Sequence, residues 1–449
     1  MIKRALISVW DKTGIVELGK FLHNNNVEII STGGTQTELE NAGIIVIPID
    51  SITGQGSIMD GRVKTLDPKI FGGILADRNN PSHLSDLALI DGLEIDLVVV
   101  NFYPFVKEAI NKNLELKKAI EFIDIGGPSM IRAAAKNYNS IVPISTPNLY
   151  DDFMTCYKNN DGKIPLDTRE KYASNVFAMT AKYESDICNY FTKDQGIFPE
   201  NINICLEKST SLRYGENPHQ KAAFYLSGDS NGLPWVQHQG KALSYNNYTD
   251  MEAAISMVLE FEKNSCAIVK HANPCGFGLG ETIVEAYKRA VATDPISYFG
   301  GIVAFNKVVD LEIAKELVKP FLECIIAPEV TSDAFNILKK KTNLRVVTIQ
   351  DNYKPSNKFI RAVAGGYLIQ EKDFDQGELD DLVVVTDLQP SQEQLISMKL
   401  GWNLVRYVKS NAIVYTNSNQ LLGVGAGQMS RIDSVKIGIR KVNEAGLNL

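Results

Sequence analysis

The sequence predicts an α/β protein with two domains, and three features support this expectation. Short β-branched runs alternate with helical stretches through the first 150 residues, the pattern of a parallel sheet wrapped by helices. Periodicity is lost near residues 195–205 and alternation then resumes, so we place one domain at 1–198 and a second at 199–449. The 449 residues also exceed what a single hydrophobic core usually serves.

In the first domain, strands and helices are expected to follow one another in short segments. The expected strands are ALISVW (5–10), VEIISTG (27–33), IIVIPID (44–50), DLVVVNFYPF (96–105) and SIVPIS (140–145). The expected helices are GIVELGKFLHNNN (14–26), TQTELENAG (35–43), MIRAAAKNY (130–138) and a helical stretch over 147–192 that breaks near Gly162 and Pro165.

The second domain begins with the turn-rich segment SLRYGENPHQ and then resumes the α/β alternation. Its expected strands are CAIVKHA (266–272), GGIVAFN (300–306), LECIIAP (322–328) and the pair SNAIVYTN (410–417) and QLLGVGAG (420–427). Its expected helices are TIVEAYKRAVAT (282–293), LEIAKELVKPF (311–321), QLISMKLGWNLVRYV (394–408) and RIDSVKIGIRKVNEAG (431–446).

The composition argues against several classes of protein. The formal net charge of −7 disfavours nucleic acid as a partner, so a phosphorylated substrate needs placed Lys and Arg side chains and helix N-termini. No apolar run approaches the roughly 20 residues that span a membrane. The six cysteines are scattered without a C-x-x-C pair, which argues against structural zinc and favours a reducing compartment. We therefore expect a cytoplasmic protein that binds neither membrane nor nucleic acid.

Two turns in the first domain join a strand to a helix through small or hydroxyl residues. They lie at 8–14 (SVWDKTG) and 31–35 (STGGT). Backbone N–H groups at such helix starts can bind a phosphate at the carboxyl edge of a sheet. Each turn alone is better explained by helix capping. Their occurrence on adjacent strands favours a phosphate pocket.

Three further segments of the first domain carry groups suited to chemistry. Lys64 lies in a long loop, which is a common place for function, although a solvated basic pair is the plain alternative. Tyr103 follows an apolar strand and is either a carboxyl-edge hydroxyl or a core aromatic residue. Asp124 precedes a helix and is either a reactive carboxylate or an N-cap.

Five motifs, in this order, carry a resemblance to a known family: SVWDKTG, STGGT, GRVKTL, NFYPFV and DIGGPSMIRAAAKN. This half of the chain resembles the IMP cyclohydrolase domain of the bifunctional AICAR transformylase/IMP cyclohydrolases. The resemblance implies a methylglyoxal-synthase-like parallel sheet and the catalytic residues Lys64, Tyr103, Asp124 and Lys136. It also implies a nucleotide site made of Ser8, Lys12, Ser31, Gly33, Gly34, Thr35, Arg62, Thr65, Asn101, Gly126 and Gly127. Trp10, Asp67 and Phe71 depart from the residues common in the family.

Ring closure of formyl-AICAR suits these residue types. A carboxamide nitrogen attacks a formamide carbon of the same molecule, so that positioning supplies much of the rate and no cofactor or metal is needed. A carboxylate such as Asp124 can accept the amide proton, while Lys and Tyr donors stabilise the oxyanion and help water to leave.

In the second domain, Lys270 and His271 end an apolar strand, where a pocket can form. Neighbouring side chains of a strand point to opposite faces, so the pair needs a bend, and the following Asn-Pro-Cys-Gly supplies turn residues. A surface lysine beside a structural histidine is the plain alternative.

Two other motif interpretations fail on their spacing. A zinc deaminase needs H-x-E and P-C-x-x-C, but Asn273 replaces the Glu and Gly278 replaces the second Cys. GVGAG (423–427) runs G-x-G-x-G, which is typical of a Gly-rich hairpin rather than of a dinucleotide site.

The motifs LRYGENPHQ, GKALSYNN, VKHANPCG, DPISYFGGIVAFN, LECIIAP, KSNAIVY and GVGAGQMSR resemble the transformylase half of the same family. The resemblance implies a larger α/β region with cytidine-deaminase-like units. It implies that Lys270 and His271 assist deprotonation of the AICAR amine and that Asn411 holds the formyl oxygen. The implied AICAR-binding residues are Arg213, Tyr214, His219, Asn246 and Asp294. The implied folate-binding residues are Phe299, Gly300 and Gly425, with 10-formyltetrahydrofolate as co-substrate.

The resemblance further implies a homodimer that handles AICAR, formyl-AICAR, inosine monophosphate and folate. Family members continue past a helix like 431–446, so we expect either a longer natural chain or an incomplete transformylase site. Two alternatives stay open. The second half could serve only nucleotide binding and dimerisation beside a working cyclohydrolase, or the first domain could be a methylglyoxal-synthase-like lyase.

Overall fold

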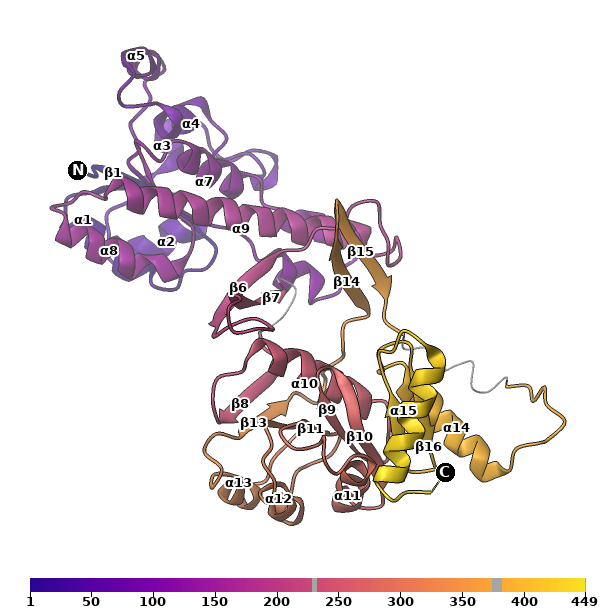
Figure 1. Cartoon of the computed structure of the whole chain (residues 1–449). Coiled ribbons are helices and arrows are strands. Elements are labelled where there is room, and N and C mark those ends of the chain that lie inside the picture. Colours follow the sequence, from indigo (N-terminus) through magenta and orange to yellow (C-terminus); the bar gives the residue numbers. More distant parts are fainter. Residues whose placement is uncertain (228–231, 374–381, 449) are drawn as a thin grey trace. The chain divides into compact units, whose positions relative to one another are not determined.

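The structure, a computed structural model, describes residues 1–227, 232–373 and 382–448. The chain divides into two compact units, Met1–Cys205 and Leu206–Leu449, which we call unit 1 and unit 2 (Figure 1). Each unit has its own sheet and its own hydrophobic core.

Unit 1 is built on a five-stranded, wholly parallel sheet of order β3-β2-β1-β4-β5. The strands are β1 (Arg4–Val9), β2 (Glu28–Ser31), β3 (Ile47–Pro48), β4 (Leu97–Asn101) and β5 (Val142–Ile144). The principal helices are α1 (Ile15–Asn24), α2 (Gly33–Asn41), α3 (Ile49–Thr53), α4 (Pro68–Leu75), α5 (Pro81–Leu89), α7 (Gly126–Lys136), α8 (Tyr150–Asn159) and α9 (Leu166–Thr192). Short helical turns are η1 (Met59–Gly61), η2 (Val106–Ile110), α6 (Leu116–Ala119), η3 (Ile120–Phe122) and η4 (Pro147–Leu149).

Alternation along the strands buries both faces of this sheet. Ile7 and its neighbours on one face pack with Leu18 of α1 and Phe153 of α8. Leu6 and Val98 on the other face pack with residues of α3, α4 and α7. A parallel sheet covered on both faces leaves its carboxyl edge as the natural place for a ligand.

The expected strand 44–50 is wrong in length. Only Ile47–Pro48 pairs with β2, and α3 begins at Ile49. Pro48 has no backbone N–H to donate to a ladder, which confines such a strand to a short edge position. The helical stretch over 147–192 is confirmed as α8 and α9, with the interruption near Gly162 and Pro165.

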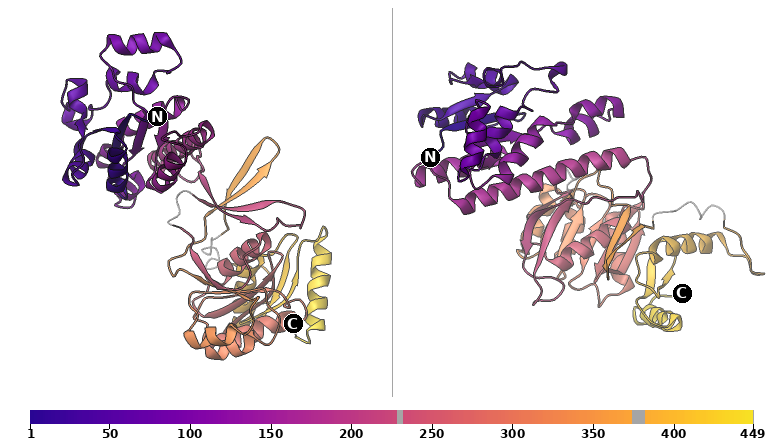
Figure 2. Two further views of the ribbon diagram at one scale, coloured as in Figure 1. Left: turned by 90° about the vertical axis from the view of Figure 1, so that its left-hand side faces the viewer. Right: turned by 90° about the horizontal axis from the view of Figure 1, so that it is seen from above.

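Unit 2 is built on a six-stranded mixed sheet of order β10-β9-β11-β12-β13-β8. Its strands are β8 (Trp235–Gln239), β9 (Asn264–Lys270), β10 (Asn273–Gly280), β11 (Ile302–Phe305), β12 (Cys324–Ala327) and β13 (Arg345–Ile349). The helices of unit 2 are α10 (Tyr245–Val258), α11 (Ile283–Thr293), α12 (Leu311–Leu317), α13 (Ser332–Leu338), α14 (Gln392–Val405) and α15 (Arg431–Glu444). α10 packs on one face of the sheet, while α11, α12 and α13 cover the other (Figure 2).

Three antiparallel strand pairs complete the described part of unit 2. They are β6 (Leu206–Leu212) with β7 (Ala222–Ser227), β14 (Lys358–Val363) with β15 (Gly366–Glu371), and β16 (Ile413–Thr416) with β17 (Leu421–Gly425). The last pair confirms the Gly-rich hairpin expected for GVGAG. α15 lies so close to it that a β-carbon added at Gly425 would stand 1.9 Å from the Ser434 carbonyl oxygen.

The bend expected in Asn-Pro-Cys-Gly is in the wrong place. Asn273 to Gly276 form the beginning of β10. The chain reverses direction just before them, at His271 and Ala272. Pro274 is tolerated in β10 because this strand stands first in the sheet order, where fewer ladder hydrogen bonds are needed.

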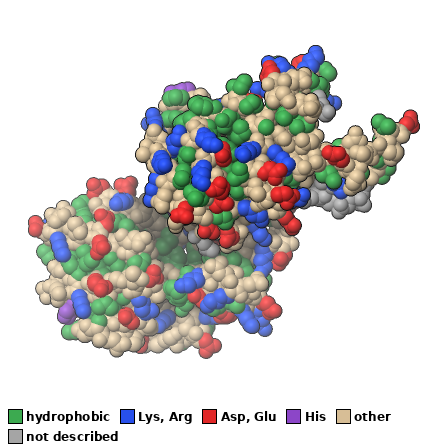
Figure 3. All heavy atoms as spheres, turned by 90° about the horizontal axis from the view of Figure 1, so that it is seen from below, with side chains coloured by type: hydrophobic (Ala, Val, Ile, Leu, Met, Phe, Trp, Pro, Cys, Tyr) green, Lys and Arg blue, Asp and Glu red, His purple; other side chains and the backbone are tan. Residues whose placement is uncertain are grey.

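Lys and Arg side chains are interspersed with Asp and Glu over the face shown in Figure 3. Across residues 1–227, 232–373 and 382–448, no helix combines the length and the apolar character needed to cross a membrane.

Candidate active sites

A cavity of about 1010 Å³ lies at the carboxyl edge of the unit 1 sheet. Successive strands proceed to one side of β1 through β2 and β3, and to the other through β4 and β5. Loops after β1 and β4 therefore diverge and leave a crevice, which is where open α/β sheets bind ligands. The size is that of a small-molecule site.

Most of the site residues expected in the first domain line this cavity. They are Ser8, Lys12, Gly33, Gly34, Thr35, Arg62, Lys64, Thr65, Asn101, Tyr103, Asp124, Gly126 and Gly127. Ser31 does not, because it is fully buried and its hydroxyl donates to the Ile7 carbonyl at 2.7 Å. Lys136 does not either: it is exposed at the far end of α7 from Gly126.

One corner of the cavity has the features of an anion site. α2 begins there with no side chain capping its first N–H groups. A β-carbon added at Gly33 would lie 3.0 Å from Lys64 Nζ, and one at Gly34 would lie 3.6 Å from Lys12 Nζ. The two ammonium groups donate no hydrogen bond to other described residues. Helix dipole, unfilled N–H groups and two lysines together suit a phosphate.

Asp124 lies just before α7 and lines the same cavity. Its Oδ1 accepts the Gly127 N–H at 3.0 Å, so it serves as a cap as well as lining the cavity. Burial raises the pKa of Asp124 above the usual value, and hydrogen bonds from Gly127 and Gly126 offset only part of that effect. A carboxylate with a raised pKa is a stronger base than an exposed one.

Two polar residues of the cavity shape its walls. Asn101 Oδ1 accepts the backbone N–H groups of Trp10 and Asp11 at 2.8 and 2.9 Å, which fixes the turn after β1. Thr35 Oγ1 accepts the Val9 N–H at 3.0 Å and donates to the Val9 carbonyl at 2.9 Å. Both side chains therefore hold the loop in place.

Two residues at the rim are more exposed. Arg62 pairs with Glu121 at 2.5 Å, and both side chains are largely exposed. The Tyr103 ring lies 6.4 Å from that of Trp10 and stays 46% exposed. The three departures from the family pattern take packing or capping roles: besides Trp10, Asp67 caps α4 by accepting the Lys69 N–H, and Phe71 packs in the core.

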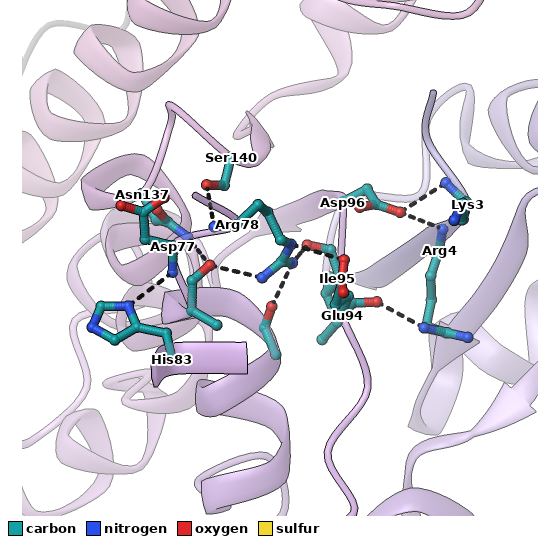
Figure 4. Close-up of polar contacts among 12 residues, drawn as sticks. Lys3, Arg4, Asp77, Arg78, His83, Glu94, Ile95, Asp96, Asn137 and Ser140 are labelled. Carbon is teal, nitrogen blue, oxygen red and sulfur yellow. Dashed lines mark hydrogen bonds and ion pairs between the residues drawn. The ribbon is translucent and has the colours of Figure 1, made fainter. Parts of the chain in front are cut away.

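At the amino-terminal edge of the unit 1 sheet, by contrast, the polar side chains bond to the protein itself (Figure 4). The Arg78 guanidinium donates to the carbonyls of Ala76, Gly73 and Ile95 at 2.7–3.0 Å. Asp96 accepts the backbone N–H groups of Lys3 and Arg4 at 2.7 and 3.0 Å. Polar groups on this side are occupied in holding loops together, whereas the carboxyl edge keeps donors available for a ligand.

Unit 2 contains a cavity of about 570 Å³ at the turn between β9 and β10. The expected site residues that line it are Arg213, Tyr214, Asn246, Lys270, His271 and Gly300. Lys270 Nζ donates to the Phe299 carbonyl at 2.9 Å, so its ammonium group is held beside the turn that presents Gly300. Phe299 itself is 57% exposed and its ring lies 5.3 Å from that of Phe321, which lines the cavity.

The remaining expected residues of unit 2 lie outside this cavity. Asn411 Nδ2 donates to the carbonyls of Gln428 and Met429. Asp294 pairs with Lys441 of α15 at 2.8 Å. His219 is exposed, and Gly425 packs against α15.

The chain segment that carries Asn411 is nevertheless linked to the cavity by hydrogen bonds of the Asn273 side chain. Lys409, two residues before it, donates its N–H to Asn273 Oδ1 at 3.0 Å. Asn273 Nδ2 in turn donates to the His271 carbonyl at 3.0 Å. The segment that carries Asn411 is thereby tied to the turn that carries His271.

Comparisons with known proteins address the family directly. Residues 134–441 match the family model described as AICARFT/IMPCHase bienzyme, and residues 14–129 match the MGS-like domain. The bifunctional purine biosynthesis protein PurH of Leptospira biflexa is 46% identical over 454 residues, covering 100% of this chain and 88% of that protein. The chain belongs to this bifunctional family.

Other members agree. PurH of Bacillus mycoides is 46% identical over 449 residues, with 99% of this chain and 88% of the relative covered. PurH of Clostridium acetobutylicum is 46% identical over 435 residues, with 96% and 86% covered. Among solved structures, a crystal structure of ForH aligns with 42% of this chain and 96% of its own at 32% identity, with a TM-score of 0.38.

The expectation of a bifunctional purine-biosynthesis enzyme is confirmed, as is that of a methylglyoxal-synthase-like first region. The matches to bifunctional relatives run through both units, so a chain with only one working half is not favoured. The two family models do not coincide with the two units. The bienzyme model begins at residue 134, inside unit 1, and continues through most of unit 2.

Sequence reasoning assigned no role to four charged residues that line the unit 2 cavity: Lys241, Asp250, Glu323 and Arg345. Asp250 belongs to α10 and Arg345 to β13. Arg345 is buried, donates to the Ala242 carbonyl at 3.2 Å and pairs with Glu323 at 2.6 Å. Neither Asp250 nor Arg345 lies in a strand-end motif, and their approach to the cavity depends on tertiary contacts. Among the residues that the structure describes, no group of three or more His, Cys, Asp or Glu could hold a metal ion.

Proposed function

We propose that the cavity of unit 1 closes the inosine monophosphate ring and that the cavity of unit 2 transfers the formyl group to AICAR. The observation that carries this proposal is that each unit has its own cavity with its own set of basic and reactive side chains. Domain assignment follows from it, with the cyclohydrolase in the first domain and the transformylase in the second.

For ring closure, we place the phosphate of formyl-AICAR at the start of α2, near Lys12, and assign Lys64 to the reacting end of the substrate. The carboxamide nitrogen attacks the formyl carbon, forming a C–N bond, and Asp124 accepts the proton that nitrogen loses. The former carbonyl oxygen is stabilised by donors from Lys64 and Tyr103. It gains two protons, equivalent to the one lost by the carboxamide nitrogen and the one lost by the formamide nitrogen as the C=N bond forms, and leaves as water. No metal or cofactor enters this scheme.

For formyl transfer, His271 and Lys270 assist removal of a proton from the AICAR amine as that nitrogen attacks the formyl carbon. Arg213, Tyr214 and Asn246 line the same cavity and would bind the nucleotide. We assign Asn411 to the oxyanion of the tetrahedral intermediate, which requires its Nδ2 group to leave the carbonyls of Gln428 and Met429. The intermediate collapses as the bond from the formyl carbon to the donor nitrogen breaks, and the deformylated donor leaves. The buried contacts of Asp294 and Gly425 with α15 suggest that these two act by supporting the site.

We propose 10-formyltetrahydrofolate as the formyl donor. The chain's own residues suit a flat, partly apolar ligand, because Phe299 and Phe321 form an exposed aromatic pair at the cavity and Gly300 turns beside them with φ +74°. Folate brings the activated formyl group, and the surrounding residues orient it. His219, which is exposed, would contribute to binding AICAR rather than folate.

We also propose a cytoplasmic homodimer. The six cysteines of the chain are free thiols, as expected in a reducing compartment. Dimerisation rests on the family resemblance, and a measurement of molar mass in solution would test it.

The experiment that tests the proposed function is a steady-state assay of the full chain with AICAR and 10-formyltetrahydrofolate. We expect tetrahydrofolate and inosine monophosphate to form in equal amounts, unaffected by a metal chelator. Absence of tetrahydrofolate while supplied formyl-AICAR is still cyclised would overturn the transformylase assignment. Loss of both activities on chelation would overturn the metal-free mechanism.

A further inference from the structure

The turn that presents His271 has an unusual backbone. β9 and β10 are joined by only two residues, because Lys270 pairs directly with Asn273. Both linking residues, His271 and Ala272, have positive φ values of 53° and 56°. Two-residue hairpins of this kind favour Asn-Gly, since a β-carbon disfavours the left-handed region. The dipeptide His-Ala has no such preference, so something else must hold the turn.

Asp250 provides that hold. Its Oδ1 accepts the Ala272 N–H at 2.6 Å, and its Oδ2 accepts the His271 N–H at 3.3 Å. One carboxylate therefore binds both amides of the turn, from a helix more than 20 residues earlier in the chain. On the opposite side, Asn273 Nδ2 donates to the His271 carbonyl at 3.0 Å.

The helix that carries Asp250 is itself fixed at its start. The Ser244 hydroxyl accepts the Asn247 N–H at 3.2 Å, and Asn247 Oδ1 accepts the Ser244 N–H at 3.0 Å, completing a capping box. Asp250 follows one turn later and lines the same cavity as His271. A carboxylate on an anchored helix can impose a costly turn conformation that the turn residues alone do not favour.

We infer that Asp250 is a positioning residue for formyl transfer: by binding the two turn amides, it aims the His271 imidazole into the cavity. This inference rests on the transformylase function proposed for unit 2. Burial raises the pKa of Asp250 above its usual value, and the hydrogen bonds from Ala272 and His271 offset only part of that rise. Asp250 acts through His271 and is distinct from the proton acceptor itself.

The first test is Asp250→Asn in the full chain. The amide keeps the size of the side chain but places an NH₂ group against a backbone N–H, which breaks one of the two bonds. We expect kcat for formyl transfer to fall by about 10²-fold, the cost typical of misplacing a catalytic group by ~1 Å. KM for AICAR should change by less than about threefold, because nucleotide contacts remain. Cyclisation of supplied formyl-AICAR should be unchanged.

A rescue variant separates positioning from a chemical role of the carboxylate. Glycine adopts positive φ without steric cost, so Asp250→Asn combined with Ala272→Gly should recover at least about tenfold of the lost kcat. A carboxylate that accepted the proton itself would give no such recovery. The matched control is Asp333→Asn, an exposed carboxylate of α13, which should leave formyl transfer unchanged.

A second variant keeps the Asp250 carboxylate and tests the same inference if Asp250→Asn does not fold. Ala272→Val places a β-branched residue at a positive φ, so we expect a kcat loss of similar size with Asp250 present. Normal kcat in either folded single variant, or no rescue by glycine, would overturn the inference. If His271→Ala abolishes transfer while Asp250→Asn does not, only the positioning role fails. If His271→Ala leaves transfer intact, the proposed function of unit 2 fails.

Discussion

The cavities of the two units are assembled in different ways. In unit 1, the lining residues of three segments follow the carboxyl ends of β1, β2 and β4, which neighbour one another in the sheet. The others, among them Lys64 and Asp124, lie in loops between helical segments. In unit 2, a two-residue hairpin turn, a helix and loops from distant parts of the chain meet at the site. The difference teaches that a parallel sheet brings part of a site together by its topology, whereas a site built around a hairpin turn depends more on tertiary contacts.

The basic side chains of the two cavities also differ in whether they are bonded to other protein groups. The ammonium groups of Lys12 and Lys64 donate to no other described residue and remain available to an anion. In unit 2, Lys270 donates to the Phe299 carbonyl and Arg345 is paired with Glu323. Substitutions in unit 1 should therefore act mainly on substrate, and many in unit 2 should act through the architecture.

The largest effect is expected for Asp124→Asn. Removing the proposed base should lower kcat for ring closure by about 10² to 10⁴-fold without affecting formyl transfer. Because burial raises the pKa of Asp124, the wild-type rate should fall on acidification at a pH above the ordinary Asp value of about 3.9. The variant should lose this acid limb. A wild-type pH profile in Asp124→Asn would exclude Asp124 as the base.

A smaller effect is expected for Gly33→Ala. The added β-carbon lies 3.0 Å from Lys64 Nζ and the residue has φ +55°, so KM for formyl-AICAR should rise by about tenfold. Gly43→Ala is the matched control, since φ is +78° and no atom lies within 4 Å of the new carbon. Both should lose about 1 kcal/mol of unfolding free energy. Equal KM values in the two variants would show that strain alone is responsible.

The smallest effect is expected for Asp294→Asn in unit 2. Loss of the charged contact with Lys441 should cost about 1–2 kcal/mol of unfolding free energy. Burial acts to raise the pKa of Asp294, but the bonds from Lys441 and Ser297 outweigh it, and the pKa is lowered. Its stabilising contribution is thus present above the unfolded pKa of about 3.9 and is lost as pH falls through the lower folded value. Thermal unfolding at pH 7 and pH 3 measures this, and an AICAR-binding defect without destabilisation would favour direct contact instead.

These differences explain how far the sequence could be interpreted. Strand ends and Gly-rich turns predicted the unit 1 cavity, because a parallel sheet brings them to one edge. Ser31 and Lys136 could not be placed, since the exact end of β2 and the length of α7 decide where their side chains lie. The sequence did not mark Asp250 as a functional residue, because an aspartate inside an amphipathic helix is usually solvated. The turn at His271 was displaced by one step because His-Ala lacks the residues that normally mark a hairpin.

The most direct test of two separate sites compares Lys64→Ala with His271→Ala in the full chain, with both reactions assayed. We predict that Lys64→Ala transfers the formyl group normally while formyl-AICAR accumulates. We predict that His271→Ala makes no formyl-AICAR but cyclises supplied formyl-AICAR at the wild-type rate. Loss of both activities in either folded variant would contradict the assignment of one activity to each cavity.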